Sequence, residues 1–536
     1  SFLYSFVVLY MAYSAWVRRR DFSAKQIIPA GVLAAAVLAC SEELTATVPL
    51  ELGTGSLDIP LYFLYNLIFL VLYLLAMLVG CVQDPLPEDA TEEQLRKART
   101  EERTQRRRSA NLLLTVMAVE LIANLTCFGL YFTGTNVTNY PKGTEHSASV
   151  IRYMHEREQR NLFFRAETTR TQTLNDGALN HYNGVSAFTS SANVKTTLFM
   201  QALGYGAKNT YNRYAFEESS PVANLFLGLK YMIDRDDKDK SNSFFVERNH
   251  FGKTSLLENQ AYLPLAFLTE PELAELTFDT SGNAFSFQNK LFAAATGLET
   301  DIWHRIPGEN LTITSEDATV TEQDGNGYCK YRDTRKNGNV TYSFTADRDG
   351  FACLHLNLPK RNDYYVSING VELYKETISL PQMIAVDDVQ SGDVIGVRIV
   401  TKADEDSTMT VGAAILDRDL FWQGYEILKA ATLELTTFES SYVKGIINCN
   451  RPGLLYASIP QNGNWEVKVD GRPAQIQLVG DCMVGVMLPE GQHLVEYIYR
   501  NQAFALGWKI SLLCAVIFGI LVFKQPKSKK RGKYQR

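Results

Sequence analysis

The chain has 536 residues, of which 46% are hydrophobic and 21% charged, with 53 basic and 59 acidic side chains. Its apolar residues are concentrated in residues 1–133 and 504–523, and the stretch between them is polar and mixed. This distribution excludes a wholly soluble and a wholly membrane-embedded protein, and the net charge of −6 argues against nucleic acid as a partner, which needs concentrated Lys and Arg.

Five apolar segments are predicted to cross a lipid bilayer, where a spanning helix needs roughly 20 apolar residues. They are residues 1–17, 26–40, 60–82, 110–132 and 504–523. The loops between them alternate in charge, because 18–25, 83–109 and the tail 524–536 are rich in bases, whereas 41–59 has four acids and no base. Basic loops stay in the cytoplasm, so all five segments span and residues 134–503 lie outside the cell.

The outer region has 34 basic and 46 acidic side chains, a net charge of −12, as this orientation predicts. Within it, helical patterns occur up to about residue 309, with a helix start at Ser219 or Ser220 before Pro221 and a helix end at Gly297. The expected fold is a membrane α-helical bundle with an extracytoplasmic α+β domain and two tandem β-sandwich modules. The expected parts are 1–133 (four membrane helices), 134–309 (α/β domain), 310–435 and 436–503 (β-sandwiches), 504–523 (last membrane helix) and 524–536 (cytoplasmic tail).

The start of the chain is unusual for a membrane protein. Position 1 is Ser, and the first apolar helix has no basic flank of the kind that opens a signal peptide. We therefore expect an upstream part that contains further membrane helices.

Two tandem modules are indicated by an internal repeat of about 100 residues. DYYVSING at 363–370 is echoed by NWEVKVDG at 464–471, and GFACLHLNLP at 350–359 by PGLLYASIPQ at 452–461. Asn-Gly at 369–370 and Asp-Gly at 470–471 are typical of two-residue hairpin turns, since both turn positions need a positive φ. The alternative is that unrelated β-sandwiches share such turns.

Four of the eight cysteines lie in the outer region, as one pair in each β module: Cys329 with Cys353, and Cys449 with Cys482. An oxidising compartment permits both disulfides, and buried free thiols are the alternative.

No metal-ligand spacing, phosphate-binding glycine loop or Gly-x-Ser-x-Gly motif occurs, so no cofactor is identified. Glu120 and Asn124 lie one turn apart in the fourth membrane segment. An ionisable residue in a bilayer indicates a functional group, or else a protonated Glu bonded to a neighbouring helix.

Two further groups of residues are candidate sites. Asn180, His181, Tyr182, Asn183 and Ser190 belong to a run dense in amide, imidazole, phenol and hydroxyl groups, which suits sugar hydroxyls; an ordinary polar turn has the same composition. The acidic loop 41–59 carries Glu42, Glu43 and Asp58, where a carboxylate can act as a base or hold a divalent cation, although such loops often serve orientation alone.

The chain resembles the YfhO-like family of bacterial membrane proteins. The resemblance extends over essentially the whole chain and is carried by ELIAN at 120–124, HYNGVSAFTSS at 181–191, SPVANLFLGLKYMI at 220–233, NQAYLPLAF at 259–267 and the block from GLLYASIP at 453 to the last helix.

This resemblance implies a GT-C-type glycosyltransferase in the bacterial plasma membrane. Such an enzyme takes a sugar from a polyprenyl-phosphate carrier on the outer face and adds it to a cell-envelope polymer of the teichoic-acid type. The essential acid of GT-C enzymes usually lies in the first external loop, which would be upstream here, so no catalytic residue is assigned. Arg152, Arg157, Arg160 and Lys509 are candidates to stabilise the departing phosphate. Two alternatives remain: a non-catalytic, membrane-anchored glycan-binding protein, and a flippase or transport component that uses Glu120.

Overall fold

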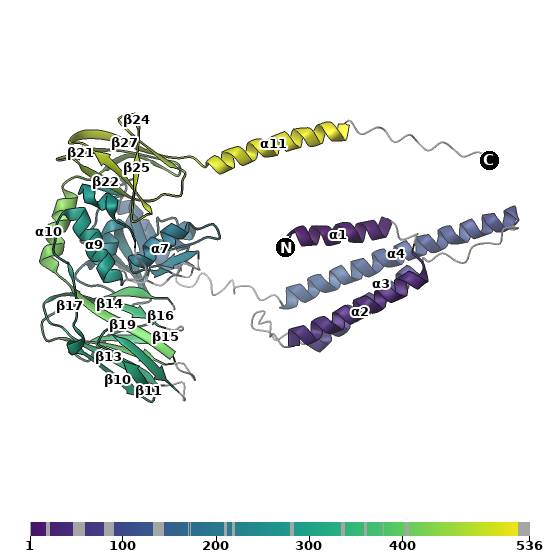
Figure 1. Cartoon of the computed structure of the whole chain (residues 1–536), viewed down its shortest axis with the longest axis horizontal. Coiled ribbons are helices and arrows are strands. Elements are labelled where there is room, and N and C mark those ends of the chain that lie inside the picture. Colours follow the sequence, from purple (N-terminus) through teal and green to yellow (C-terminus); the bar gives the residue numbers. More distant parts are fainter. Residues whose placement is uncertain are drawn as a thin grey trace. The chain divides into compact units, whose positions relative to one another are not determined.

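The computed structural model describes residues 2–17, 22–46, 59–79, 91–131, 144–169, 171, 173–207, 212–216, 220–278, 283–333, 338–358, 362–378, 380–401 and 407–523. The chain forms two compact units, Ser1–Tyr140 and Pro141–Arg536 (Figure 1).

The first unit contains apolar helices at the four positions where the sequence predicts membrane segments. They are α1 (Phe2–Val17), α2 (Ala24–Ala46), α3 (Ile59–Leu78) and α4 (Glu92–Tyr131). A fifth apolar helix, α11 (Gln502–Phe523), follows the last strand of the second unit. Among the described helices, Glu92–Thr126 and Gln502–Leu521 are long and apolar enough to cross a membrane, and Phe6–Ala15, Ala24–Cys40 and Leu64–Leu78 are shorter apolar stretches. Spanning by all five therefore stays a prediction.

Helix α4 extends far beyond its apolar part. Its 40 residues span about 60 Å at 1.5 Å per residue, so the basic segment 92–109, expected as part of a loop, is helical. The helix begins with a capping box, in which Thr91 Oγ1 accepts a hydrogen bond from the Gln94 backbone N–H and Gln94 Oε1 accepts one from Thr91 N–H. An ion pair between Glu102 and Arg106, four residues apart, supports the charged turns.

The second unit begins with mixed α/β structure around two sheets. One sheet has the order β1-β5-β7-β6, with β1 parallel to β5 and the other pairs antiparallel; a smaller one has the order β2-β4-β3. The elements are α5 (Thr144–Arg157), β1 (Arg165–Thr168), α6 (Asp176–Asn180), β2 (Ala187–Phe188), α7 (Val194–Ala202), β3 (Gly206–Ala207), β4 (Arg213–Ala215), α8 (Pro221–Phe226), β5 (Leu229–Arg235), β6 (Phe245–Phe251), β7 (Thr254–Asn259), β8 (Ala266–Thr269), η2 (Pro271–Glu275) and α9 (Ala284–Thr296).

Two helix boundaries in this part agree with the sequence. Ser220 Oγ accepts a hydrogen bond from the Ala223 backbone N–H at the start of α8, and Pro221 takes the first helical position, where a missing N–H does no harm. Helix α9 ends at Gly297, whose φ of 75° is accessible to glycine at little cost.

A first β-sandwich follows. Its sheets have the orders β10-β13-β18-β15-β16 and β11-β12-β19-β14-β17, and apolar side chains from both sheets form one hydrophobic core. The elements are β9 (Trp303–Arg305), which pairs with β19, η3 (Gly308–Asn310), β10 (Leu311–Glu316), β11 (Thr319–Gln323), β12 (Tyr328–Arg332), β13 (Asn339–Thr345), β14 (Gly350–Asn357), β15 (Asn362–Ile368), β16 (Val371–Ile378), β17 (Gln382–Val389), β18 (Val394–Val400) and β19 (Ser407–Leu416).

Helix α10 (Arg418–Lys429) leads into a second β-sandwich, which has its own core. Its sheets have the orders β20-β21-β27-β23-β24 and β25-β26-β22-β8. The strands after α10 are β20 (Glu434–Glu439), β21 (Tyr442–Cys449), β22 (Gly453–Pro460), β23 (Trp465–Val469), β24 (Arg472–Ala474), β25 (Ile476–Val479), β26 (Met483–Leu488) and β27 (Gly491–Tyr499).

The two sandwiches share one strand arrangement. The five-stranded sheet of the second sandwich repeats the strand order of its counterpart in the first, position by position. The hairpin turns also match: Asn369 and Asp470 both have φ of 51°, and each accepts a backbone hydrogen bond at Oδ1, from Val394 and Leu494 respectively. In the other sheet, β22 of the second sandwich corresponds to β14 of the first. The neighbour of β14 is β19, and the corresponding neighbour of β22 is β8. The second sandwich is therefore completed by a strand that comes earlier in the chain than the whole first sandwich.

Candidate functional site

A surface pocket of about 270 Å³ opens in the second unit between the small β2-β4-β3 sheet, the start of α7 and the end of β22. It is lined by Ala187, Thr189, Ser191, Ala192, Asn193, Thr196, Asn212, Tyr214, Pro460 and Asn462.

Backbone pairing fixes one wall of the pocket. Ala187 in β2 pairs with Tyr214 in β4, and the Thr189 backbone N–H donates to the Asn212 carbonyl at 3.1 Å. The chain then turns, since the Ala192 N–H donates to the Thr189 carbonyl at 3.2 Å and the Ser191 N–H donates to Thr189 Oγ1 at 3.3 Å. Local hydrogen bonding thus holds this wall in place.

Asn193 joins this wall to the opposite one. Its Oδ1 accepts a hydrogen bond from the Lys195 backbone N–H at 3.0 Å and so caps α7. Its Nδ2 donates to the Gln461 carbonyl at 3.0 Å, in the loop after β22. One amide therefore fixes both the start of α7 and the distance between the two walls.

The pocket offers neutral polar groups and one aromatic ring. None of its ten lining residues is charged; they include hydroxyl groups, primary amides and Tyr214. Burial raises the pKa of Tyr214, so its hydroxyl stays protonated and can donate a hydrogen bond. Beneath the surface, Cys482 Sγ lies 3.6 Å from Thr196 Oγ1. Such a surface suits a neutral ligand rich in hydroxyl groups better than a phosphate.

None of the five residues predicted to bind sugar lines this pocket, and several of them have local contacts. Tyr182 is buried, Asn180 Nδ2 donates to the Asp176 carbonyl, and Asn183 Nδ2 donates to the Phe164 carbonyl. His181 ends α6 with φ of 62°. Ser190 is exposed between two pocket-lining residues and does not itself line the pocket.

The sequence alone does not predict which residues line the pocket. Asn212, Tyr214, Pro460 and Asn462 lie on segments that are distant in the chain and meet only in the folded structure. A partial signal exists, since Asn462 belongs to a QNGN turn in which Gly463 has φ of 88°. The sequence therefore predicts the turn, but it does not predict that the turn lies opposite residues 187–196.

The polar pair of the fourth apolar segment bonds to α3. Glu120 accepts a hydrogen bond from Tyr73 Oη, and Asn124 Oδ1 accepts one from Tyr65 Oη at 3.0 Å. A buried Ser109 Oγ also donates to the Ala76 carbonyl at 2.7 Å. These contacts join α3 to α4 along their length, as polar side chains do between membrane helices.

The acidic-loop candidates are not placed as a site. The backbone of Glu42 and Glu43 lies in α2, and Asp58 lies outside the described residues. In the described part of the chain, no group of three or more His, Cys, Asp or Glu is arranged to hold a metal ion.

Cys329, Cys353, Cys449 and Cys482 are buried free thiols. Cys353 and Cys482 belong to the core of the α/β part, whereas Cys329 belongs to the core of the first sandwich and Cys449 to that of the second. Each expected pair is thus divided between two cores. The disulfides 329–353 and 449–482 are therefore absent, and burial raises the pKa of Cys482 to about 11.

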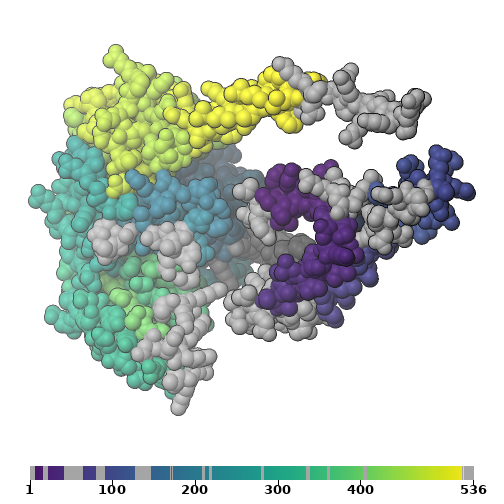
Figure 2. Space-filling view, turned by 45° about the vertical axis from the view of Figure 1, so that its right-hand side comes forward, coloured from purple at the N-terminus to yellow at the C-terminus, as the bar shows by residue number. Residues whose placement is uncertain are grey.

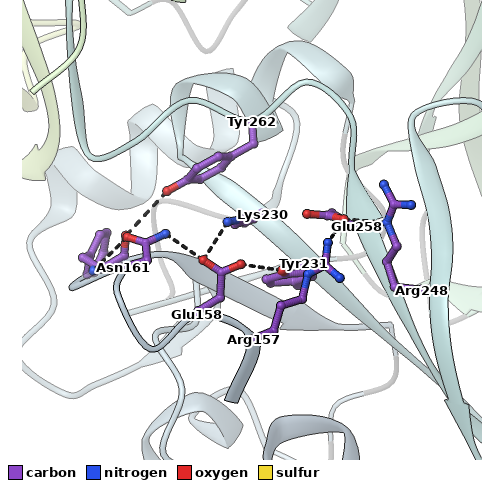
Figure 3. A network of polar contacts seen from close by, with 9 residues as sticks. Arg157, Glu158, Asn161, Lys230, Tyr231, Arg248, Glu258 and Tyr262 are labelled. Atoms are coloured by element: carbon purple, nitrogen blue, oxygen red, sulfur yellow. Dashed lines mark hydrogen bonds and ion pairs between the residues drawn. The ribbon is translucent and has the colours of Figure 1, made fainter. Parts of the chain in front are cut away.

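A charged network beside β5 has the composition of a catalytic site but is saturated with hydrogen bonds (Figure 3). Glu158 accepts hydrogen bonds from Lys230 Nζ at 2.7 Å, Tyr231 Oη at 2.6 Å and Asn161 Nδ2 at 3.0 Å. Nearby, Glu258 bonds with Arg157 at 3.2 Å. Because both oxygens of Glu158 are engaged, the network is suited to joining α5 to the β1-β5-β7-β6 sheet rather than to transferring protons.

The chain was compared with protein families. The family described as "Bacterial membrane protein YfhO" matches residues 1–511. A comparison with curated proteins found no match.

Solved structures that resemble part of the chain include carbohydrate-binding modules. One is a family 35 module from Clostridium thermocellum, 13% identical over 21% of this chain and 96% of that chain, with a TM-score of 0.16. Another is the low-affinity xylan-binding module CBM86 from Roseburia intestinalis, 12% identical over 22% of this chain and 95% of that chain, with a TM-score of 0.18. Similarities this low say nothing about a ligand of this chain.

Proposed function

This chain belongs to the YfhO family of bacterial membrane proteins, and we propose that it binds a saccharide of the cell envelope in the pocket around Tyr214 and serves glycosyl transfer on the outer face of the membrane. The observation that carries the proposal is the pocket itself, whose lining combines hydroxyl and amide side chains with one aromatic ring and includes no charged residue.

A saccharide matches these groups one by one. Its hydroxyls need both donors and acceptors, which the amide of Asn212 and the hydroxyl of Tyr214 can supply. Its C–H faces pack on an aromatic ring, which Tyr214 supplies. The carrier phosphate of a lipid-linked sugar would need cationic partners, and these would have to come from outside the pocket lining.

The transfer step rests on the family resemblance to GT-C-type glycosyltransferases, with a polyprenyl-phosphate sugar as donor and an envelope polymer as acceptor. A carboxylate base has to activate the acceptor hydroxyl in such a reaction. The buried Glu167 behind β2 does not suit this role, because it accepts backbone hydrogen bonds from Thr168, Val185 and Ser186. The pocket is therefore proposed to bind and orient a saccharide while another part of the enzyme supplies the base.

A second candidate is favoured by the same observation. With no carboxylate in the pocket lining, a membrane-anchored protein that only binds glycan would present the same surface. Transfer of a labelled sugar from a polyprenyl-phosphate donor, measured in nanodiscs with the protein purified together with any residues encoded before Ser1, separates the two: turnover supports the enzyme, and saccharide binding without turnover supports the binding protein.

The binding proposal is tested with defined envelope saccharides and the full chain in detergent. Tyr214→Ala removes the ring and should weaken binding at least about tenfold, corresponding to about 1.4 kcal/mol, whereas Tyr214→Phe keeps the ring and should lose less. Tyr328→Ala is the matched control, a half-buried tyrosine of the first sandwich. Equal affinities of wild type and Tyr214→Ala for every saccharide that binds would refute the assignment of the pocket.

A further inference from the structure

We infer that the edge of the second unit formed by residues 187–196 lies in the outer headgroup layer of the membrane, with Phe188 and Val194 in contact with lipid. The pocket beside this edge then opens at the membrane surface. The inference goes beyond the proposed function, because lipid contact by this edge does not require that the pocket bind a saccharide.

The first step is the position of the membrane relative to the second unit. Helix α11 has 22 residues and is about 33 Å long, which matches a hydrocarbon core of about 30 Å. It follows β27 after only Arg500 and Asn501, and Asn501 Oδ1 accepts a hydrogen bond from the Phe504 backbone N–H at the helix start. The sandwich and the helix are therefore joined by two residues, and in Figure 2 the yellow helix directly adjoins the yellow-green sandwich.

The second step links the start of α11 to the pocket. Tyr499 is three residues before α11, so its backbone lies within about 11 Å of the helix start at no more than 3.6 Å per residue. Its hydroxyl accepts a hydrogen bond from Nδ2 of the pocket residue Asn462 at 3.1 Å. Through Gln461, the same loop accepts the hydrogen bond from Asn193 on the opposite wall. In Figure 1, α7 lies on the side of the unit from which α11 departs.

Two aromatic residues lie at the end of the sandwich where we expect the membrane surface. Trp465 and Tyr499 pack edge to face with their ring centroids 5.1 Å apart, at the end of the sandwich that continues into α11. Trp and Tyr are enriched where a membrane protein passes through the headgroup layer, because their rings have an apolar body and a polar edge. This layer is about 5–8 Å thick on each side of the hydrocarbon core.

The third step concerns the side chains of the edge itself. Phe188 is 48% exposed and Val194 57% exposed, and neither lines the pocket, although Ala187 and Thr189 on both sides of Phe188 and Asn193 before Val194 do. In β2, alternation turns Phe188 away from the side of Ala187. Single exposed apolar residues are ordinary on a protein surface, so exposure alone carries little weight. What distinguishes this pair is its position beside the start of a spanning helix, next to the exposed Lys195, whose charge is attracted to lipid phosphates.

The bilayer is the occupant that this position favours. A second copy or another protein would have to reach this edge, whereas α11 brings lipid to it in every molecule. The first sandwich offers a contrast: Val371 is 67% exposed and Leu373 39% exposed on β16, without a comparable link to α11. We therefore expect lipid contact at 187–196 and not at 371–373.

The test uses the full chain in phospholipid nanodiscs that contain a small fraction of a phospholipid with a photoreactive diazirine near its headgroup. After irradiation, mass spectrometry maps the lipid adducts. The wild-type chain should carry adducts at 187–196 and at the start of α11, with a yield at 371–373 at least about fivefold lower. Equal yields at 187–196 and 371–373 would overturn the inference without the need for any variant.

Two double variants sharpen the result. Phe188→Ser with Val194→Ser should lower the adduct yield at 187–196 at least about threefold relative to the yield on α11, whereas Val371→Ser with Leu373→Ser should leave that ratio unchanged. An unchanged ratio in the first double variant would contradict the role of these two side chains. Saccharide binding by the Tyr214 variants in detergent is a separate measurement, so a failed pocket and a failed membrane contact give different results.

Discussion

Replacement of Glu158 by glutamine should destabilise the second unit, because it leaves the ammonium group of Lys230 without its carboxylate. The two side chains are 2.7 Å apart and only 8% and 16% exposed. Breaking one partner of a buried ion pair costs about 3–5 kcal/mol, and the remaining exposure of Lys230 together with the Tyr262 ring at 5.1 Å reduces this to about 2–3 kcal/mol. For a unit of this size we expect Tm to fall by about 5 °C.

The assay is thermal unfolding of the full chain in detergent, followed by near-ultraviolet circular dichroism. Glu258→Gln is the matched control in the same network: its partners Arg157 and Arg248 are 41% and 37% exposed, so the loss should stay below about 1 kcal/mol. The double replacement Glu158→Leu with Lys230→Met removes both charges and should recover most of the stability. A Glu158→Gln variant as stable as Glu258→Gln would refute the reasoning.

The same pair predicts a pH dependence. Burial by itself raises the pKa of Glu158, but hydrogen bonds from Lys230, Tyr231 and Asn161 outweigh it and lower the pKa below its ordinary value of 4.5. The stabilisation is therefore present above about pH 4.5 and is lost as the pH falls through the lowered pKa of the folded state. Glu158→Gln should lack this acid-dependent part of the loss.

Three further predictions concern the β-sandwiches and their cores. Burial lowers the pKa of His355 from 6.5 to about 4, so the unfolded chain binds more protons than the folded chain between these values. His355→Gln should therefore remove about 2–3 kcal/mol of the stability lost from pH 6.5 to pH 4, measured by denaturant unfolding. Gly471→Ala, at a φ of 76°, should cost about 1 kcal/mol, whereas alanine at the extended Gly412 should cost less; equal losses would contradict the turn argument. The thiols of Cys329, Cys353, Cys449 and Cys482 should react with a water-soluble maleimide only on unfolding, and rapid labelling of any of these four in the folded chain would contradict their burial.

Patterns local in sequence gave correct predictions of the fold. The turn pairs at 369–370 and 470–471 form hairpins because their residue types tolerate positive φ in any surroundings. Each of the five apolar segments contains a helix over most of its described residues, as its composition predicts. The predicted loop at 92–109 is helical, and its capping box of Thr91 and Gln94 can be recognised in the sequence.

Contacts between segments that are distant in the chain could not be predicted from the sequence. The short run Ala266–Thr269 has no signal that it pairs with β22, since Thr269 and Leu454 are 185 residues apart. The candidate site shows the same limit. The polar run 180–191 lies near the pocket, but tertiary contacts decide which side chains face it: Asn183 bonds to a carbonyl, whereas Thr189 lines the pocket beside Asn212.

The position of β8 also affects the order in which the emerging chain can fold. At a synthesis rate of about 5–20 residues per second, roughly 10–40 s pass between the appearance of Thr269 and that of Leu454, 185 residues later. During this interval the first sandwich, whose strands lie between them, can close by itself, while β8 waits with an unpaired edge beside α9. The second sandwich can therefore assemble only late, when β22 pairs with β8, which was synthesised much earlier. Chains arrested before β22 should need chaperones that cover the unpaired edge of β8.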